Sequence, residues 1–133
     1  LGQISSFRSD RFVVISRVPD LQRYYRLLTI LCLPTLREGL PNVALEAQAS
    51  SVPVVTTNAT GAIDSVENRV TGVVVAKQSP GELAAALRCL LQDEFYRAQL
   101  AANARPWVLK NFDAKLVIDN NLMHFSDLVN NSV

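Results

Sequence analysis

Residues 33–47 read LPTLREGLPNVALEA, and this stretch determines how the rest of the chain is interpreted. It follows a short apolar run, Ile30–Leu33, which is typical of a strand covered on both faces. After Pro41 a helical pattern begins. That helix must end near Ser50, because Pro53 biases the residue before it away from helical geometry. The stretch therefore links a buried strand to a helix.

Three further apolar runs flank this link, and helical patterns separate them along the chain. They are Phe12–Ile15, Pro53–Val55 and Val73–Ala76. Strands that alternate with helices form a parallel sheet through crossover connections. We therefore predict an α/β fold with about four parallel strands, helices on both faces and further helices at the C-terminal end.

Capping signals mark the starts of the predicted helices. Residues of the type favoured at the N-cap are Asp20, Ser79, Asp93 and Asp113. Glu82 stands three residues after Ser79 and completes a capping box with it. Pro106 should kink the helix that begins at Asp93, because proline removes a backbone donor.

Composition narrows the range of possible functions. The 133 residues suit one domain, and a hydrophobic content of 49% supports a real core. The formal net charge is only +1 without a basic cluster, which argues against nucleic-acid binding. The longest apolar stretch, Leu27–Leu33, is too short to cross a membrane. Cys32 and Cys89 have no metal-like spacing, so we expect free, buried thiols in a reducing cytoplasm.

The 33–47 stretch also carries the candidate chemistry. Its loop leaves the carboxyl end of a strand and presents a helix N-terminus, where amides and the helix dipole favour an anion such as phosphate. Gly39 permits a tight turn and a close backbone approach. Glu38 and Glu46 bracket the loop and can face one crevice, where carboxylates suit sugar hydroxyls. Alternatively, Glu38 is solvated or paired with Arg37, and Glu46 only complements the helix dipole.

A second loop, residues 56–62, leaves the next predicted strand and is small and polar. It either donates backbone N–H groups to a phosphate or is an ordinary connection between a strand and a helix.

The sequence from Glu38 to Ala47, with seven residues between Glu38 and Glu46, resembles the signature of family 4 retaining glycosyltransferases of the GT-B fold. Other segments agree with that family, and together they cover nearly the whole chain. They are Val18-Pro19-Asp20 with Tyr24-Tyr25, Leu33-Pro34-Thr35, Pro53-Val54-Val55, Gly61, Thr71-Gly72-Val73-Val74 and Phe112.

The resemblance implies a Rossmann-like domain that binds a nucleotide-diphosphate sugar, with neither a metal nor a cofactor. Glu38 would be the catalytic residue that contacts the hydroxyls of the transferred sugar. Glu46 would hold the ribose hydroxyls, and Val18 would sit beside the nucleobase. The other donor-binding positions would be Gly39, Leu40, Pro41, Asn42 and Gly61.

The same resemblance implies that residues 1–133 are part of a longer enzyme. The acceptor domain, which would bind a saccharide or a lipid, and the arginine and lysine that grip the diphosphate lie upstream in the family. We therefore expect the chain alone to be inactive, and the parent enzyme to be cytoplasmic or peripheral at a membrane. Two alternatives remain open: a GT-B sugar-nucleotide epimerase, and a non-catalytic nucleotide-binding or interaction module.

Two departures from the family pattern affect the fold. Ser51 stands where the family has a glycine with positive φ after the helix, so this serine is strained or the turn differs. If the first strands of the domain are absent, Ile30–Leu33 has a free edge. A free apolar edge recruits another strand, so we expect either pairing with Phe12–Ile15 or homo-oligomers through this edge.

Overall fold

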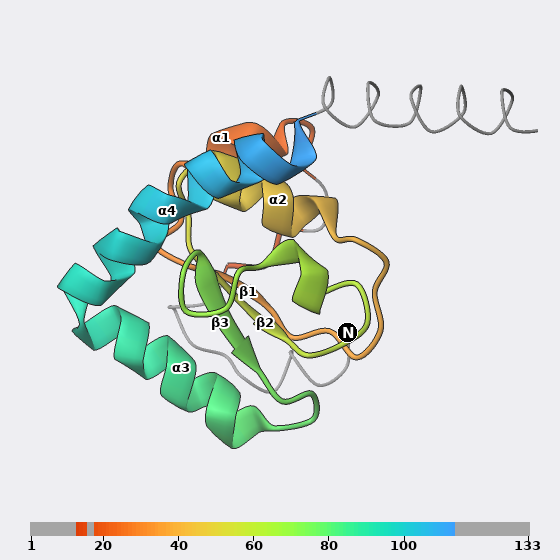
Figure 1. Cartoon of the computed structure of the whole chain (residues 1–133), viewed down its shortest axis with the longest axis vertical. Coiled ribbons are helices and arrows are strands. Elements are labelled where there is room, and N and C mark those ends of the chain that lie inside the picture. Colours follow the sequence, from red (N-terminus) through yellow and green to blue (C-terminus); the bar gives the residue numbers. More distant parts are fainter. Residues whose placement is uncertain (1–12, 16–17, 114–133) are drawn as a thin grey trace, which may run out of the picture.

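The computed structural model describes residues 13–15 and 18–113, which contain a parallel sheet with helices packed on it (Figure 1). Strands β1 (Leu31–Leu33), β2 (Val54–Thr57) and β3 (Gly72–Val75) lie in the order β1-β2-β3, and both pairings are parallel. The α/β prediction is confirmed. Three predicted strands are present, with ends that differ from the expected ones by one or two residues.

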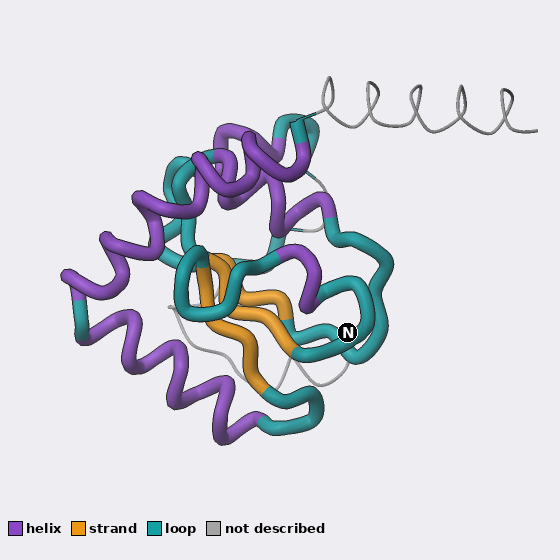
Figure 2. Tube along the Cα trace, in the orientation of Figure 1, coloured by secondary structure: helices purple, strands orange, loops and turns teal. Residues whose placement is uncertain are grey.

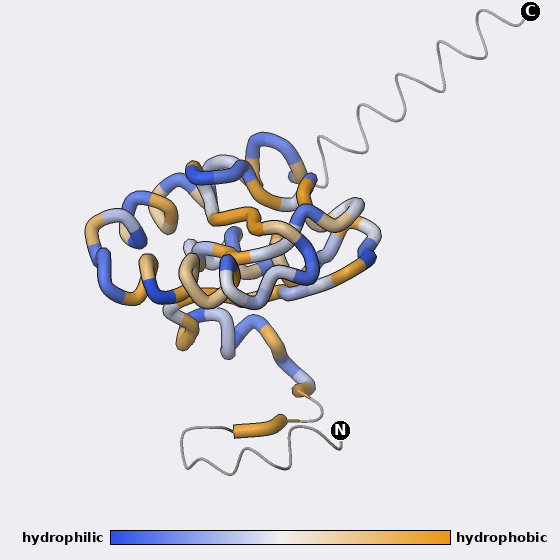
Figure 3. The backbone as a smooth tube through the Cα atoms, turned by 90° about the horizontal axis from the view of Figure 1, so that it is seen from below, coloured by the Kyte–Doolittle hydropathy of each residue, from blue (hydrophilic) through white to orange (hydrophobic). Residues whose placement is uncertain are grey.

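The fourth predicted strand, Phe12–Ile15, is wrong for the residues that can be judged. Val13, Val14 and Ile15 have no regular structure and are 83%, 66% and 51% exposed, and Figure 3 shows this apolar segment apart from the sheet. Phe12 lies outside the described residues. A strand needs a hydrogen-bonding neighbour as well as apolar side chains. In the described part of the chain, β1 pairs only with β2, so association of copies through its other edge stays a prediction.

Two apolar layers, one on each side of the sheet, explain why the strand sequences are continuously hydrophobic. In Figure 2 the strands lie between helices on either side. Alternate side chains of β2 and β3 enter opposite layers, whereas in β1 Leu31 and Leu33 enter one layer and Cys32 is exposed. The layer beneath α1 (Leu21–Tyr25) and α2 (Asn42–Ala49) contains Tyr25, Ala44, Ala47, Val52, Val54, Leu31, Leu33 and Val74. The layer beneath α3 (Pro80–Gln92) and α4 (Glu94–Phe112) contains Val55, Leu90, Leu100, Ile30, Val73 and Tyr96.

The helix starts agree only partly with the capping signals. Asp93 caps α4 as predicted, since its side chain accepts a hydrogen bond from the Tyr96 amide at 2.8 Å. The capping box is wrong: Ser79 makes no side-chain cap, and Glu82 Oε2 instead accepts from the Ala76 amide at 3.0 Å. Asp20 makes no cap either.

Helix α4 continues through Pro106 to Phe112. The further helix expected after Asp113 lies outside the described residues.

Ser51 adopts a left-handed conformation, with φ of 60°, at the position where the resemblance leads us to expect glycine. The Ser51 amide bonds to the Gln48 carbonyl and the Val52 amide to the Ala47 carbonyl, both at 2.9 Å. These are the two bonds of a Schellman motif, which ends α2 and turns the chain toward β2. The turn is therefore the expected one, and the serine carries its strain.

The loop after β2 is locked onto the loop after β1 by Gly61. Its φ is +77°, and a Cβ there would lie 2.6 Å from the Glu38 carbonyl oxygen and would overlap the Gly39 carbonyl. The short 3-10 helix η2 (Ile63–Ser65) follows and is tied to α2. Gln48 Nε2 donates to the Ser65 carbonyl at 2.6 Å and to the Ala44 carbonyl at 3.0 Å.

Replacing Ser51 with glycine should stabilise the fold. A left-handed residue other than glycine costs about 1–2 kcal/mol, and added backbone freedom in the unfolded chain offsets roughly half of the gain. We expect Ser51→Gly to raise the free energy of unfolding by about 0.5–1 kcal/mol, measured by chemical denaturation. Ser50→Gly is the matched control and should destabilise, because Ser50 has φ of −91°. Equal effects of the two substitutions would show that Ser51 is unstrained.

Gly61→Ala should destabilise far more than Gly39→Ala. The methyl group at position 61 meets two backbone carbonyls and a positive φ, whereas the space around a Cβ at Gly39 is open to 4 Å. We expect a loss of about 2–4 kcal/mol for Gly61→Ala and less than about 0.5 kcal/mol for Gly39→Ala in the same unfolding measurement. A mild effect at position 61 would mean that the two loops are not held together by this contact.

Candidate functional site

The carboxyl ends of the three strands meet at one edge of the sheet, and polar side chains there fix the loops. Thr56 Oγ1 donates to the Leu33 carbonyl at 3.1 Å, and Thr57 Oγ1 donates to the Thr35 carbonyl. Asn58, which follows β2, bonds to the end of β3 and to the loop after it. Its amide donates to the Val75 carbonyl, and its Oδ1 accepts from the Lys77 amide, both at 2.8 Å. These bonds hold the loops after β1, β2 and β3 in fixed relative positions.

Glu38 lies in an open cleft at this edge, which we call the Glu38 cleft. Its volume is about 740 Å³, and its lining residues are Leu36, Arg37, Glu38, Gly39, Thr60 and Lys77. The Glu38 side chain is exposed, and its closest hydrogen bond is a long one of 3.4 Å from Thr35 Oγ1. The cleft thus combines one accessible carboxylate with two cationic side chains.

The charges of the Glu38 cleft are not neutralised within the described residues. Neither Arg37 nor Lys77 forms an ion pair with a carboxylate of that part of the chain, so the alternative in which Glu38 is paired with Arg37 is wrong. An accessible carboxylate accepts hydrogen bonds from hydroxyls, and unpaired cations attract anions. This combination suits a ligand that carries both hydroxyl and anionic groups.

Glu46 lies in a different hollow, which we call the Glu46 hollow. Its volume is about 260 Å³, and its lining residues are Gln22, Tyr25, Arg26, Glu46, Ala49, Ser50, Arg105 and Leu109. Tyr25 Oη donates to Glu46 Oε2 at 2.9 Å. Burial of Tyr25, then the hydrogen bond to Glu46 and its charge, raise the pKa of the phenol, so Tyr25 remains protonated and acts as the donor.

The two glutamates therefore do not share one crevice, contrary to the sequence-based expectation. Glu38 stays in the loop that faces Thr60 and Lys77, while α2 turns Glu46 toward α1 and α4. Glu46 is the fifth residue of α2, and this helix has no acidic residue in its first turn. The interpretation of Glu46 as a first-turn partner of the helix dipole is accordingly disfavoured.

Of the remaining predicted site residues, only Gly39 lines the Glu38 cleft, and the others line neither hollow. Gly61 contacts the Gly39 backbone. Pro41 is buried at the N-cap of α2, and its carbonyl accepts from the Ala44 amide. Leu40 is 44% exposed, and Asn42 is exposed as the first residue of α2. Val18 is half-buried and lines neither hollow.

Sequence reasoning missed Lys77 and Arg105 as lining residues and Tyr25 as the partner of Glu46, whereas Thr60 lies in the 56–62 loop that it did consider. Lys77 closely follows β3, so the rule that ligands bind beyond carboxyl ends of strands could have found it. Arg105 comes from α4 and donates to the Ala49 carbonyl at 3.2 Å. Nothing in its sequence context indicated that contact.

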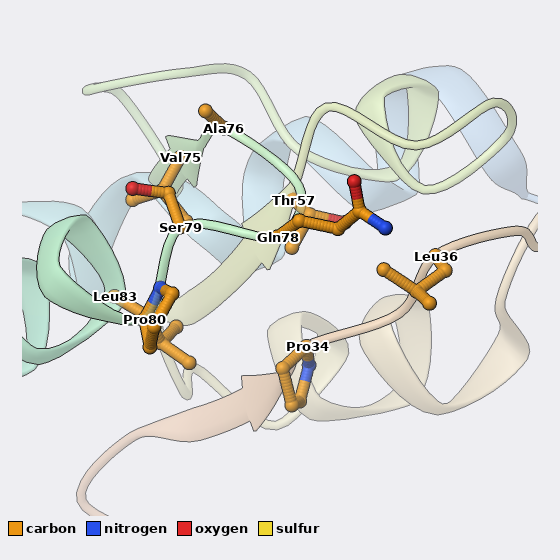
Figure 4. Close-up of a pocket in the computed structure, with 9 residues that line it drawn as sticks. All are labelled: Pro34, Leu36, Thr57, Val75, Ala76, Gln78, Ser79, Pro80 and Leu83. Carbon is orange, nitrogen blue, oxygen red and sulfur yellow. The ribbon is translucent and has the colours of Figure 1, made fainter.

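A third hollow lies beside the Glu38 cleft and is mostly apolar (Figure 4). Its volume is about 170 Å³, and the ends of all three strands contribute to it through Pro34, Thr57 and Val75. Leu36 lines both this hollow and the Glu38 cleft, so the two adjoin.

The described residues contain no group of three or more His, Cys, Asp or Glu side chains arranged to hold a metal ion. Cys32 and Cys89 are free thiols, as predicted, but both are exposed, so their predicted burial is wrong. Cys32 lies on β1, an edge strand of the sheet, and Cys89 lies on α3. Within the described ranges, no helix has the length and apolarity needed to cross a bilayer.

Comparisons with known proteins agree with this fold. The capsular polysaccharide biosynthesis glycosyltransferase CapM of Staphylococcus aureus is 40% identical over 110 residues, which are 83% of this chain and 29% of CapM. Sucrose-phosphate synthase from Thermosynechococcus elongatus superposes with a TM-score of 0.87 at 25% identity, over 96% of this chain and 33% of that one. HepE from Anabaena in complex with UDP-glucose has a TM-score of 0.86 at 23% identity, over 95% of this chain and 35% of HepE.

The chain spans about a third or less of the length of these relatives, since it covers 29% of CapM and 35% of HepE. The family model described as "Glycosyl transferases group 1" matches residues 3–93, which is more than half of the chain. With the parallel sheet and the clefts at its carboxyl edge, this match shows that the chain belongs to the glycosyl transferases group 1 family.

Proposed function

We propose that this chain is the donor-binding part of a family 4 retaining glycosyltransferase, which transfers a sugar from a nucleotide-diphosphate sugar to an acceptor. The observation that carries the proposal is the Glu38 cleft, where an accessible carboxylate and two unpaired cations lie at the carboxyl edge of a parallel sheet. The named glycosyltransferase relatives favour this function over an epimerase or a non-catalytic module.

In this proposal the Glu38 cleft receives the transferred sugar and the diphosphate. Glu38 accepts hydrogen bonds from sugar hydroxyls, which orients the anomeric carbon toward the acceptor. Negative charge develops on the diphosphate as the bond to the sugar breaks. The amides at the start of α2 and the Lys77 and Arg37 side chains oppose that charge, and such electrostatic stabilisation is usually the largest catalytic contribution.

The Glu46 hollow receives the nucleoside in the same proposal. Glu46 accepts from the ribose hydroxyls, and its carboxylate is exposed to a ligand while Tyr25 holds one of its oxygens. Gly39, Leu40, Pro41 and Asn42 form the backbone path between the two hollows, and Gly61 supports it from beneath. Val18 faces the nucleobase once the nucleotide is bound.

The acceptor is bound outside the described residues in this proposal. CapM and HepE are about three times as long as this chain, and the acceptor-binding domain belongs to that additional length. The nucleotide sugar is a substrate, and neither a metal nor a cofactor takes part. The acceptor is a saccharide or a lipid, as expected from the resemblance.

Glu46→Ala should weaken nucleotide binding. A hydrogen bond to a charged group contributes about 1.5–3 kcal/mol, so we expect the dissociation constant to rise by roughly one to two orders of magnitude. Isothermal calorimetry with UDP, GDP and ADP measures this change and identifies the preferred base. Glu94→Ala is the control, since Glu94 is also a helix glutamate but lies on α4 with its side chain 89% exposed. Equal affinities of both variants and the wild type would exclude Glu46 from the nucleotide site.

Glu38→Ala should abolish turnover with little effect on folding. The side chain is exposed and, among the described residues, makes one long hydrogen bond, so its truncation should change the free energy of unfolding by less than about 0.5 kcal/mol. Turnover of the nucleotide sugar by the complete enzyme should fall far more than nucleotide affinity, because Glu38 contacts the sugar. Glu38→Gln, which preserves shape, separates charge from packing. Normal turnover per folded molecule together with a large loss of stability would make Glu38 a structural residue.

A further inference from the structure

We propose that Tyr25 is the positioning residue for Glu46: its hydroxyl fixes one carboxylate oxygen so that the other faces the ribose of the nucleotide. This inference rests on the proposed function, because it assigns Tyr25 a role in the same nucleotide site. Nothing in the resemblance gave Tyr25 a part in binding.

The geometry combines a buried anchor with an exposed carboxylate. Tyr25 is only 2% exposed, and its ring is packed in the layer that contains Ala44, Ala47 and Val54. Its hydroxyl nevertheless reaches the Glu46 hollow and donates to Glu46 Oε2 at 2.9 Å. The anchor is therefore held in the core, while the residue whose carboxylate it holds is exposed to solvent.

An exposed glutamate without such an anchor samples several rotamers, and binding a ligand in one of them costs side-chain entropy. The bond from Tyr25 selects one orientation before the ligand arrives. In the described part of the chain, no other hydrogen bond to the Glu46 carboxylate is found, so Oε1 is available to ribose hydroxyls. Preorganisation of this kind raises affinity without adding a contact to the ligand.

In the hydrogen bond between Tyr25 and Glu46, the phenol is always the donor and the carboxylate the acceptor. Burial and the neighbouring carboxylate raise the pKa of the Tyr25 phenol, so the phenol donates at all physiological pH values. The cations that line the same hollow, Arg26 and Arg105, form no ion pair with Glu46. Tyr25 is thus the group that orients the carboxylate.

A purely structural role is the competing explanation, since the bond also links α1 to α2. The two roles differ in what Tyr25→Phe does. This substitution keeps the buried ring and removes only the hydroxyl that enters the hollow, so the core remains packed. A structural tie lowers stability and leaves nucleotide affinity unchanged, whereas a positioning role lowers affinity in the folded protein.

The test is a double-mutant cycle of nucleotide affinity, measured by calorimetry with UDP, GDP and ADP. We expect Tyr25→Phe to weaken binding about three- to tenfold, the effect of one net hydrogen bond. Tyr24→Phe is the matched control on the same helix and should bind like the wild type, because Tyr24 is 38% exposed and lines neither hollow. In the Glu46→Ala background, Tyr25→Phe should cause no further loss.

Wild-type affinity of Tyr25→Phe, or a further loss in the Glu46→Ala background, would overturn the positioning role while leaving the proposed function intact. All affinities are measured in the complete enzyme, and failure of its wild-type form to bind any of the three nucleotides would instead overturn the proposed function, and the positioning role with it. Circular dichroism and melting curves on each variant confirm that affinities are compared between folded proteins.

Discussion

The contact between Gly61 and the Glu38–Gly39 backbone is the constraint on which the candidate site depends. The loop after β1 carries Glu38 on an exposed surface, and few side-chain contacts hold it there. The backbone of the neighbouring loop supplies a support at a distance that only glycine permits. Gln48 and Thr57 extend this support, since one ties η2 to α2 and the other ties β2 to the β1 loop. These contacts hold the loop that carries Glu38 in a defined position.

The same stretch of sequence supplies two chemically different environments. At its start, Glu38 lies among cations in an open cleft; one helical turn into α2, Glu46 lies beside a buried phenol. Solvent screens the charges at the first position, so they act mainly on a ligand that displaces water. At the second position the orientation is set in advance by packing. One end of the stretch therefore provides electrostatic attraction, and the other provides alignment.

Sequence reasoning predicted the elements whose signals are local. Continuous apolar runs identified β1, β2 and β3, because apolar layers lie on both sides of the sheet at β2 and β3. Pro41 and Pro53 delimited α2. For Ser51 the family resemblance left open a strained serine or a different turn, and the structure shows the strained serine in the expected turn. The same reasoning failed at Val13–Ile15, since an apolar run becomes a strand only beside a partner strand.

The errors at the site have a similar origin. The spacing of Glu38 and Glu46 indicates that the two residues bracket one loop. The hollow that each side chain lines depends on the direction of α2 relative to α1 and α4, which the spacing does not give. Lys77 and Arg105 are distant from that loop in sequence and reach the hollows only through the fold. The capping box failed because the Ala76 amide competes for the Glu82 carboxylate, and this amide is placed there by the end of β3.

Both hollows are open to solvent on one side, and this has a consequence for catalysis. The Glu38 cleft is bounded by three loops and the Glu46 hollow by three helices, so a donor bound as proposed would stay open to solvent on one side. Water that remains in contact with an activated sugar competes with the acceptor and screens the charges that stabilise the departing diphosphate. Transfer rather than hydrolysis therefore requires a second surface that closes over the donor. In the proposed function that surface is the acceptor domain, so acceptor binding and exclusion of water would be one event.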